Sequence, residues 1–489
     1  METPPLDNER HLRYWQRCLR SVLPHQYTSN DSIRMTLGCF IVAAVDLLSP
    51  TSTSPAGPAP SDKPKAASIT PSDRLRIREW VLSCQHPGGG FCGAPTHALR
   101  PQDYEGWDAE ARKPETANSG AANVAATYFA LVLLALVAED SAAESAFSGV
   151  RRAETLDWLR RLQRDDGSFG EVLYDVPAQA QGRTKNKWVV AGGSDTRYCY
   201  LAAAIRWMLR GDIRPGGSGW VEDINVESLI GHIRQGQTYD GGFAETSHHE
   251  SHAGYAYCAI SALSLLDRPA ENSTASHDGA ILRRAIADQP ALTEWLASRP
   301  FEYLEEAEEA EDNEEDNFAQ PTCLADTVGA SEIKYAGFNG RCNKVADTCY
   351  TWWVGGTLSI LGLDDDPERR LVPTEAARRF LMEKTQHLIG GFAKHPKGPP
   401  DIYHAYLGLA ALATLGETER LKEFDSALVV SMDAVKRIEA GRRGLFRAAG
   451  KGKQGTQEGQ SAERRLREMG LDMLGREVSW LPAVQGSCQ

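Results

Sequence analysis

The sequence predicts an all-α fold, an α/α toroid in which outer and inner helices alternate around a ring. Two observations predict it. A short turn containing glycine and phenylalanine recurs five times, at Phe91, Phe169, Phe243, Phe338 and Phe392. These turns separate segments apolar on one side from segments apolar nearly all round. A helix of the first kind covers a core and one of the second kind must be buried, so repeated pairs indicate two concentric rings.

The outer helices come first in each pair and end near a glutamine, in IREWVLSCQ, LDWLRRLQ, LIGHIRQ and ARRFLMEKTQ. The inner helices follow the turns, in TYFALVLLALV, TRYCYLAAAIRWML, GYAYCAISALSLL, DTCYTWWVGGTLSIL and IYHAYLGLAALATL. Glycine permits the positive φ that a reversal between two helices requires. An open solenoid is the structural alternative, but aromatic-rich inner helices favour closure around an apolar cavity.

Composition defines the remaining segments and excludes some functions. The net charge of the 489 residues is −13, and ten acidic residues lie between Glu302 and Asp316. No basic footprint for nucleic acid is present. We therefore expect a toroid over 1–429 with a low-complexity insert at 49–73 and an acidic, disordered insert at 302–320. Residues 430–489 are expected to form a partly disordered C-terminal extension.

Targeting signals are lacking at the N-terminus, which has no apolar signal core. The longest apolar stretch, near 128–137, falls short of the ~20 residues that a membrane span needs. The ten cysteines indicate reduced, mostly buried thiols. We expect a cytoplasmic protein without a membrane span.

Polar residues gather where the predicted inner helices begin, and a toroid would bring these helix ends to one mouth. Asp347, Cys349 and His404 supply oxygen, sulfur and nitrogen ligands from two successive inner helices. Three protein ligands with an open fourth position are typical of a catalytic zinc site. Taken singly, each has another explanation: a helix N-cap, a core cysteine and a histidine satisfied at a helix start.

A second group, His252, Arg341, Lys344 and Tyr350, falls near the same mouth. Helix N-termini carry positive potential, and arginine and lysine add charge, so this group favours a diphosphate. The alternative is surface charge on a loop.

Four segments, DTCYTWWVGGTL, GGFAKHPKGPPDIYHAYLGLAAL, ESHAGYAYCAISAL and HLRYWQRCLRSVLP, resemble the β subunits of protein prenyltransferases. The resemblance runs from about His11 to about Ala427. It implies a heterodimer with a helical-repeat α subunit, one Zn²⁺ per β subunit, and a thioether formed on the cysteine of a C-terminal CaaX motif.

The resemblance also implies roles for individual residues. The zinc ligands would be Asp347, Cys349 and His404. The diphosphate and lipid would contact His252, Gly254, Arg341, Lys344, Tyr350, Arg197, Trp353 and Phe40, and Tyr403 would contact the end of the peptide.

Two positions indicate the branch that resembles the type I geranylgeranyltransferase. Thr36 stands where the farnesyl enzyme carries a bulky tryptophan, and a small residue there would leave a deeper cavity for geranylgeranyl diphosphate. Lys394 stands where the farnesyl enzyme has an aspartate that helps bind magnesium, so Mg²⁺ should not be required. The CaaX clients would end in Leu or Phe and include Rho-type small GTPases. The alternatives are a farnesyltransferase or Rab geranylgeranyltransferase β subunit, a triterpene-cyclase-like enzyme and a non-catalytic toroid.

Overall fold

A computed structural model describes residues 4–27, 29–50, 69–95, 107–108, 113–114, 122–176, 187–211, 213, 215–217, 219–270, 279–304, 333–363 and 370–451. Most of the low-complexity insert at 49–73, most of the acidic insert at 302–320 and the extension beyond 451 lie outside the described residues.

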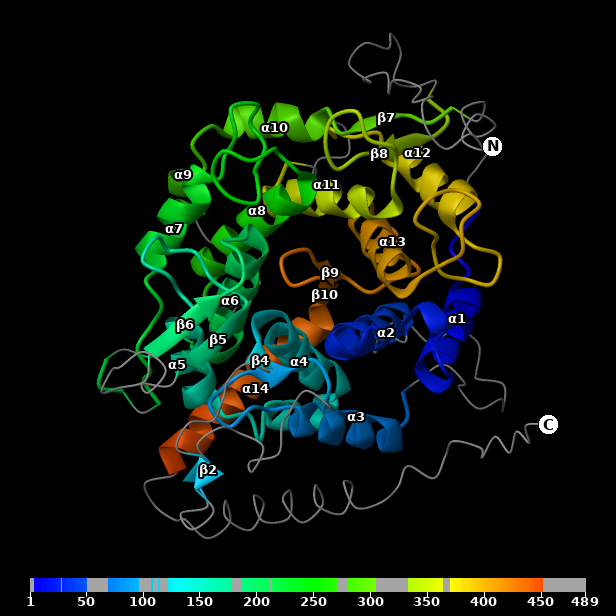
Figure 1. Cartoon of the computed structure of the whole chain (residues 1–489). Coiled ribbons are helices and arrows are strands. Elements are labelled where there is room, and N and C mark those ends of the chain that lie inside the picture. The colour runs from blue at the N-terminus through cyan, green and yellow to red at the C-terminus, as the bar shows by residue number, and fades with distance from the viewer. Residues whose placement is uncertain are drawn as a thin grey trace, which may run out of the picture.

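Six buried helices form a closed inner ring (Figure 1). They are α2 (Arg34–Leu48), α4 (Val124–Val137), α6 (Thr196–Leu209), α8 (Ala253–Asp267), α11 (Thr348–Ile360) and α13 (Ile402–Thr414). Each contacts the next, and α13 contacts α2. This confirms the toroid and adds α2 to the five inner helices expected from the sequence.

The outer ring consists of helices on the outside of these six. They are α1 (Asn8–Arg20), α3 (Pro71–Ser83), α5 (Arg152–Arg161), α7 (Val226–Gln235), α10 (Gln289–Ala297) and α12 (Thr374–Arg379), with the small α9 (Ala280–Ala285) between α8 and α10. A π-helical turn, Phe380–Thr385, continues α12 as far as Gln386, the glutamine that ends the last outer helix. Short 3₁₀ helices occupy His25–Tyr27, Asp31–Ile33 and, as η6, Asp140–Ser145.

Strands are short and lie between the helices. A four-stranded antiparallel sheet has the order β1 (Phe91–Cys92), β4 (Ala122–Asn123), β5 (Val172–Val176) and β6 (Lys187–Ala191). Three two-stranded pairs complete the set: β2 (Trp107–Asp108) with β3 (Lys113–Pro114), β7 (Pro300–Glu302) with β8 (Ala336–Phe338), and β9 (Phe424–Asp425) with β10 (Val430–Ser431). The helical prediction therefore holds for the body of the ring.

A repeated contact explains the glutamines that end the outer helices. In four turns the glutamine forms a backbone bridge with the phenylalanine six residues later: Gln85 with Phe91, Gln163 with Phe169, Gln237 with Phe243 and Gln386 with Phe392. The side-chain amide then binds the start of the next outer helix. Gln163 donates to the Asn225 carbonyl at 2.9 Å and accepts from the Asn225 N–H at 2.7 Å. The side chain thus joins consecutive repeats.

The glycine of each turn is needed for a close backbone approach. Gly167 has a φ of +87°, and a Cβ there would lie 2.0 Å from the Ser228 carbonyl oxygen in α7. No other residue type fits such a contact. At the end of the chain, a Cβ on Gly390 would lie 2.6 Å from the Arg10 carbonyl oxygen in α1. The last turn therefore packs on the first helix as the turns at Gly89, Gly167 and Gly241 pack on α5, α7 and α10.

His11 completes that closing contact. Its Nδ1 accepts the Gly391 N–H at 3.2 Å, so in the neutral ring Nε2 carries the proton and donates to the Gln386 side-chain oxygen at 2.9 Å. The imidazole is fully buried and stacks on Phe392. Burial lowers the pKa of His11 to about 4, so the ring is closed by a neutral histidine.

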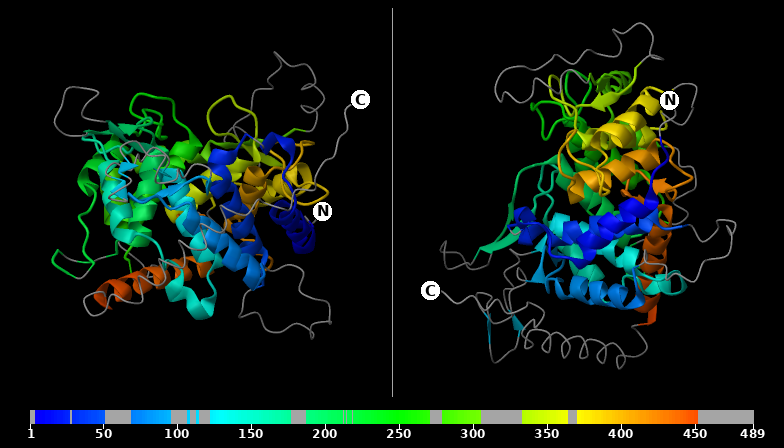
Figure 2. Two further views of the ribbon diagram at one scale, coloured as in Figure 1. Left: turned by 60° about the horizontal axis from the view of Figure 1, so that its bottom comes forward. Right: turned by 90° about the vertical axis from the view of Figure 1, so that its right-hand side faces the viewer.

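The structure shifts two boundaries expected from the sequence. Helix α3 begins at Pro71, inside the segment assigned to the insert 49–73, because Thr70 and Asp73 form a capping box. Helix α14 (Met432–Lys451) covers the first part of the extension 430–489 and packs on α4 and η6 (Figure 2). It is held there by the buried side chains of Ala434, Val435 and Ile438.

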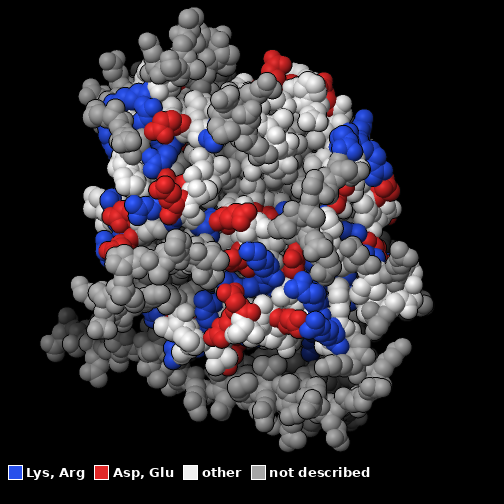
Figure 3. Space-filling view, turned by 180° about the vertical axis from the view of Figure 1, so that it is seen from behind, with Lys and Arg blue, Asp and Glu red and all other residues white. Residues whose placement is uncertain are grey.

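On the face seen in Figure 3, Lys and Arg side chains are interspersed with Asp and Glu rather than gathered into one basic field. Among the helices that the structure describes, none combines the length and apolar character needed to cross a bilayer.

The closing histidine should make stability depend on pH. The pKa of His11 is about 4 in the folded chain and 6.5 as a reference value, so its stabilising effect is complete above pH 6.5 and is lost as pH falls toward 4. Lowering the pH from 7 to 5 should therefore reduce the free energy of unfolding by about 2 kcal/mol through this histidine. Urea unfolding of the chain and of His11→Gln at both pH values measures the difference.

His25→Asn, at an exposed histidine outside the closing contact, is the matched control. An equal fall in stability for the unmodified chain and His11→Gln would contradict the role given to His11.

Candidate active site

The N-caps of five inner helices create a polar mouth at one end of an otherwise apolar ring. They are Asn123, Asp195, His252, Asp347 and Asp401, and each accepts a backbone N–H of its own helix through its side chain. The alternation of outer and inner helices gives all inner helices the same direction. Their positive ends therefore meet at the same mouth, as predicted.

Asp347, Cys349 and His404 come together at this mouth. One potential ligand atom from each residue lies within 4.8 Å of those of the other two. Asp347 and Cys349 are buried, and His404 Nε2 is 3.3 Å from Asp347 Oδ1. The Cys349 N–H donates to Asp347 Oδ1 at 2.8 Å. Asp347 is thus the N-cap of α11 and a candidate ligand at once, so the two interpretations of this residue are compatible.

The electrostatics of this trio suit a cation. Burial and the neighbouring carboxylate of Asp347 raise the pKa of the Cys349 thiol well above its usual value. Burial lowers the pKa of His404, but the carboxylates of Asp347 and Asp401 outweigh it and raise it to about 9. A divalent cation would relieve both effects, because it stabilises the thiolate and replaces the imidazole proton.

Asp401 supports the trio from behind and was not predicted from the sequence. Its Oδ2 lies 2.6 Å from His404 Nδ1, while its Oδ1 accepts the His404 N–H at 2.9 Å. This hydrogen bond leaves Nε2, the nitrogen near Asp347, available for a metal. A carboxylate behind a ligating histidine is typical of zinc sites. Three donors of zinc-binding type, with a carboxylate that fixes the imidazole, fit one Zn²⁺ and leave room for a fourth ligand.

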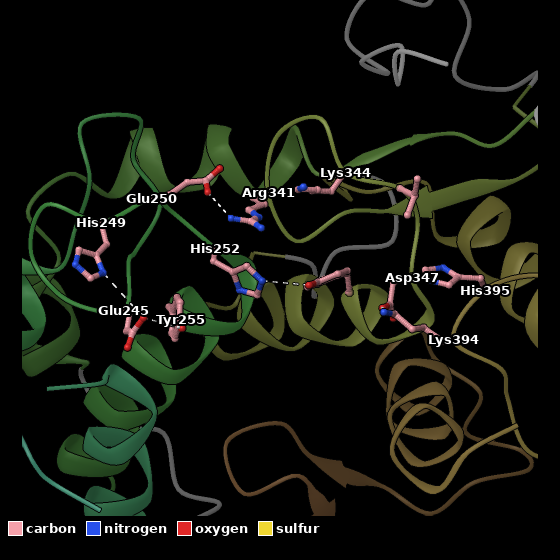
Figure 4. Close-up of a pocket in the computed structure, with 12 residues that line it drawn as sticks. Glu245, His249, Glu250, His252, Tyr255, Arg341, Lys344, Asp347, Lys394 and His395 are labelled. Atoms are coloured by element: carbon pink, nitrogen blue, oxygen red, sulfur yellow. Dashed lines mark hydrogen bonds and ion pairs between the residues drawn. The ribbon is translucent and has the colours of Figure 1, made fainter. Parts of the chain in front are cut away.

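An open pocket of about 600 Å³ adjoins the trio (Figure 4). Its lining combines cationic, acidic and aromatic side chains, namely Glu245, His249, Glu250, His252, Tyr255, Arg341, Lys344, Val345, Asp347, Tyr350, Lys394 and His395. Four predicted diphosphate residues, His252, Arg341, Lys344 and Tyr350, are therefore brought together. Lys394 joins them, with its Nζ 3.9 Å from Asp347 Oδ2.

His252 is held in one orientation within this pocket. Its Nδ1 accepts the N–H of Gly254, so in the neutral ring Nε2–H donates to the Tyr350 hydroxyl at 3.1 Å. Burial and the charge of Arg341 lower its pKa to about 4, so it is neutral at pH 7. Gly254 belongs to the site through this backbone N–H. His252 and Tyr350 thus supply polar hydrogens beside the two basic residues.

Arg341 has an acidic partner of its own. Its guanidinium pairs with Glu250 across the pocket, and both side chains are partly exposed (Figure 4). Lys344 also lines this pocket. Unlike Arg341, it has no carboxylate paired with it among the residues drawn in Figure 4. An incoming diphosphate would compete with Glu250 for Arg341.

Behind the polar mouth, the bore of the ring is apolar and aromatic. Phe40, Trp353 and Tyr403 line it, and Phe40 lies between Phe129, Tyr403 and Tyr406 in a cluster of rings. Trp353 and Tyr403 also lie close to Cys349, so the apolar space begins beside the candidate metal ligands. The predicted lipid residues Phe40 and Trp353 and the peptide residue Tyr403 share this cavity.

Two predicted lipid residues lie elsewhere. Arg197 forms an ion pair with Asp195 and lies over the Tyr255 ring, with its side chain 60% exposed. Thr36 is half-buried in the first turn of α2, four residues before Phe40, whereas the described lining of the bore takes Cys39, Phe40 and Ala43 from this helix.

The hydrogen bond from Asp401 should tune metal binding. Asp401→Asn keeps an N-cap for α13 but removes the charge beside His404, so zinc affinity should fall by about 10–100-fold. Competition with a chromophoric chelator measures it. Asp195→Asn, the same change at the N-cap of α6, is the control and should leave zinc affinity unchanged. Equal affinities for Asp401→Asn and the unmodified chain would exclude the metal-supporting role.

Comparison with known proteins agrees with this geometry. Residues 6–430 match the family described as prenyltransferase alpha-alpha toroid domain. The chain is 28% identical to the geranylgeranyl transferase type-1 subunit beta of Arabidopsis thaliana over 84% of its own length and 85% of that protein. It is 23% identical to the protein farnesyltransferase subunit beta of Pyricularia oryzae over 84% of its length and 63% of that protein.

A solved structure supports the same architecture. The Candida albicans protein geranylgeranyltransferase-I complexed with GGPP matches with a TM-score of 0.64 and 24% identity, over 90% of this chain and 100% of that one. At this identity the likeness concerns the fold. Together with the family match over most of the chain, these findings show that the protein belongs to the prenyltransferase α/α-toroid family, as a protein prenyltransferase β subunit.

Proposed function

We propose that the chain is the catalytic β subunit of a type I protein geranylgeranyltransferase. It transfers the geranylgeranyl group of geranylgeranyl diphosphate to the cysteine of CaaX proteins ending in Leu or Phe, such as Rho-type small GTPases in the cytoplasm. A helical-repeat α subunit would complete the enzyme. The observation that carries this proposal is the position of Asp347, Cys349 and His404, between a cationic pocket and an apolar aromatic bore.

The zinc-binding residues would position the nucleophile. A bound Zn²⁺ supplies the positive charge that keeps a cysteine sulfur of the substrate as thiolate at neutral pH. Asp347 and His404 are fixed by hydrogen bonds to their own helices, and Asp401 orients the imidazole. These contacts hold the ligands in place before substrate arrives, which lowers the cost of ordering them.

The pocket residues would act on the leaving group. As the bond between C1 of the lipid and the diphosphate oxygen breaks, negative charge grows on the diphosphate. Arg341, Lys344 and Lys394 offer charge, and His252 and Tyr350 offer polar hydrogens, and all five line the same pocket. Donors fixed before the reaction stabilise such charge most effectively.

The bore would hold the hydrocarbon chain. The bore is narrow, with a volume of about 80 Å³. A lipid of fifteen or twenty carbons must therefore displace some of the aromatic side chains that line it. Phe40, Trp353 and Tyr403 are placed to make this adjustment beside the reacting sulfur. Burial of the chain at about 0.8 kcal/mol per CH₂ would drive binding.

Two observations favour the geranylgeranyl branch over the farnesyl branch. The Arabidopsis relative of highest identity reported above is a type I geranylgeranyl transferase subunit. Lys394 puts a cation, not a carboxylate, 3.9 Å from Asp347, so the pocket carries its own charge where the farnesyl enzyme would use magnesium. Thr36 contributes less to the argument, because it lies outside the lining of the bore.

Transfer by the purified heterodimer tests the proposal. The chain is co-expressed with its α subunit and given a peptide ending in Cys-aliphatic-aliphatic-Leu, with geranylgeranyl and farnesyl diphosphate in parallel. Preferred transfer of the twenty-carbon group, lost in Cys349→Ala, is expected. Preference for farnesyl would assign the protein to the other branch, and no transfer with either lipid from an intact, zinc-loaded heterodimer would overturn the proposal.

Lys394 should replace magnesium in the reaction. Chelation of Mg²⁺ should leave the unmodified enzyme active, whereas Lys394→Ala should lose about 10–100-fold in kcat and recover part of it with millimolar Mg²⁺. Lys397→Ala, in the same loop but outside the pocket lining, is the matched control. A strict Mg²⁺ requirement in the unmodified enzyme would contradict the role of Lys394.

A further inference from the structure

One carboxylate in the mouth of the ring has no part in the mechanism described above. Glu250 faces Arg341 across the pocket, and its Oε2 lies 2.5 Å from a terminal nitrogen of the guanidinium (Figure 4). The side chain of Glu250 is 58% exposed and that of Arg341 is 42% exposed. The pocket therefore contains an anion of its own beside one of the cations proposed to bind diphosphate.

The loop that carries Glu250 fixes its position. Ser251, the next residue, forms a backbone bridge with Ala244, and its hydroxyl donates to Asp240 at 2.6 Å. His252, the N-cap of α8, follows directly. The backbone next to Glu250 is thus held by a bridge, a side-chain hydrogen bond and a helix start, and its carboxylate points toward Arg341 (Figure 4).

The loop that carries Arg341 is joined to the same helix. The carbonyl of Gly340 accepts the N–H of Ala253, the first residue of α8, at 2.8 Å. A Cβ on Gly340 would lie 2.2 Å from the ring of Tyr350, so this loop also packs closely on α11. The backbone bond joins the two loops one residue before Arg341 and three residues after Glu250. The ion pair is therefore set by the backbone of the site, unlike a pairing of two side chains on an open surface.

The other two cations of the pocket have different surroundings. Lys394 Nζ lies 3.9 Å from Asp347, a candidate metal ligand. Lys344 has no carboxylate paired with it among the residues drawn in Figure 4. Glu250 thus neutralises Arg341 in particular and leaves the charge of Lys344 to attract an incoming anion.

The exposure of the pair allows one anion to replace another. More than half of the Glu250 side chain is already in contact with water, so it can turn away from Arg341 at little cost in desolvation. A diphosphate carries several negative charges and accepts forked hydrogen bonds from a guanidinium, so it binds Arg341 more strongly than one carboxylate oxygen does. When the diphosphate leaves, the same guanidinium regains the carboxylate.

We propose that Glu250 is an exchangeable counterion of Arg341. It neutralises the guanidinium in the empty pocket, gives way when the lipid diphosphate binds, and returns as inorganic diphosphate leaves after transfer. The exchange weakens retention of the inorganic diphosphate that the reaction releases. This inference rests on the proposed function for its role in turnover. Glu250 is a positioning residue, since it acts through Arg341.

Binding of inorganic diphosphate to the purified, zinc-loaded heterodimer tests the proposal. Glu250→Gln keeps the size of the side chain and removes its charge, so Kd should fall about fivefold, as expected when a partly exposed ion pair no longer competes. In an Arg341→Ala background the same change should alter Kd by less than about twofold, because the counterion has lost its partner. Isothermal titration calorimetry of the four proteins measures this cycle. A misfolded variant would bind diphosphate more weakly, so a gain in affinity cannot result from misfolding.

Glu245→Gln is the matched control. Glu245 also lines the pocket, but its carboxylate accepts the Tyr255 hydroxyl at 3.3 Å and is not paired with Arg341. Its effect on Kd should be the same with and without Arg341. Equal factors for Glu250→Gln in the two backgrounds would show that Glu250 acts only through its charge in the mouth, and would overturn the proposal.

Steady-state transfer supplies a second readout. With inorganic diphosphate as inhibitor against geranylgeranyl diphosphate, Ki should fall about fivefold in Glu250→Gln, whereas KM for the Cys-aliphatic-aliphatic-Leu peptide should stay the same. A general disturbance of the mouth would instead raise both constants, and that result would contradict the role given to Glu250.

The outcomes separate this inference from the proposed function. If the heterodimer transfers lipid but Glu250→Gln binds diphosphate no more tightly than the unmodified enzyme, the inference alone fails. If the heterodimer transfers no lipid, the proposed function fails, and the cycle with inorganic diphosphate still decides whether Glu250 and Arg341 exchange. Absence of diphosphate binding in all four proteins would overturn the inference as well.

Discussion

The ring closes because four of the glycine turns lie directly against the backbone of the next outer helix. At Gly167 the approach leaves no room for a Cβ, and the glutamine before the turn binds the same neighbour with both ends of its amide. Such a contact fixes the distance and direction between consecutive repeats. Closure then requires that the last repeat meets the first, which it does through Gly390 and His11. A repeat whose contact were looser would give an open solenoid instead.

Closure determines where chemistry can occur. All inner helices point their N-termini to one mouth, so capping groups that would be scattered in an open array become neighbours. Asp347 shows the consequence, because one carboxylate caps α11 and faces His404. Asp401 does the same for α13 while it orients the imidazole. Helix capping and the candidate metal site therefore share side chains, and the positive helix ends add to the positive potential of the mouth.

The sequence predicts this architecture well because the repeat is local. Apolar faces and the glycine turns are visible in short windows, and three ligands from two successive inner helices follow once the ring is assumed. Asp401 was missed although it lies three residues before His404, since an N-cap aspartate gives no sign of a second role. Helix α2 was missed as an inner helix because it does not follow a glycine–phenylalanine turn.

Other features depend on contacts between distant parts of the chain. Four tyrosine hydroxyls, from Tyr128, Tyr200, Tyr257 and Tyr406, donate to the backbone carbonyls of residues 426–429, and Tyr128 is 300 residues away from its partner Leu428. No local pattern predicts these hydrogen bonds. One signal was present: an aromatic residue at the fifth position of five inner helices. The expected role of Thr36 came from a resemblance at one position, and it stays a prediction.

The segment 426–429 inside the ring depends on four hydrogen bonds acting together. Tyr257, Tyr200, Tyr128 and Tyr406 donate in turn to the carbonyls of its four consecutive residues. A buried carbonyl left without its donor costs about 1–3 kcal/mol. A shift of the whole segment would break all four bonds, so the opposing cost is their sum. The position of this segment is therefore fixed by four inner helices together, and a single tyrosine contributes only a part of it.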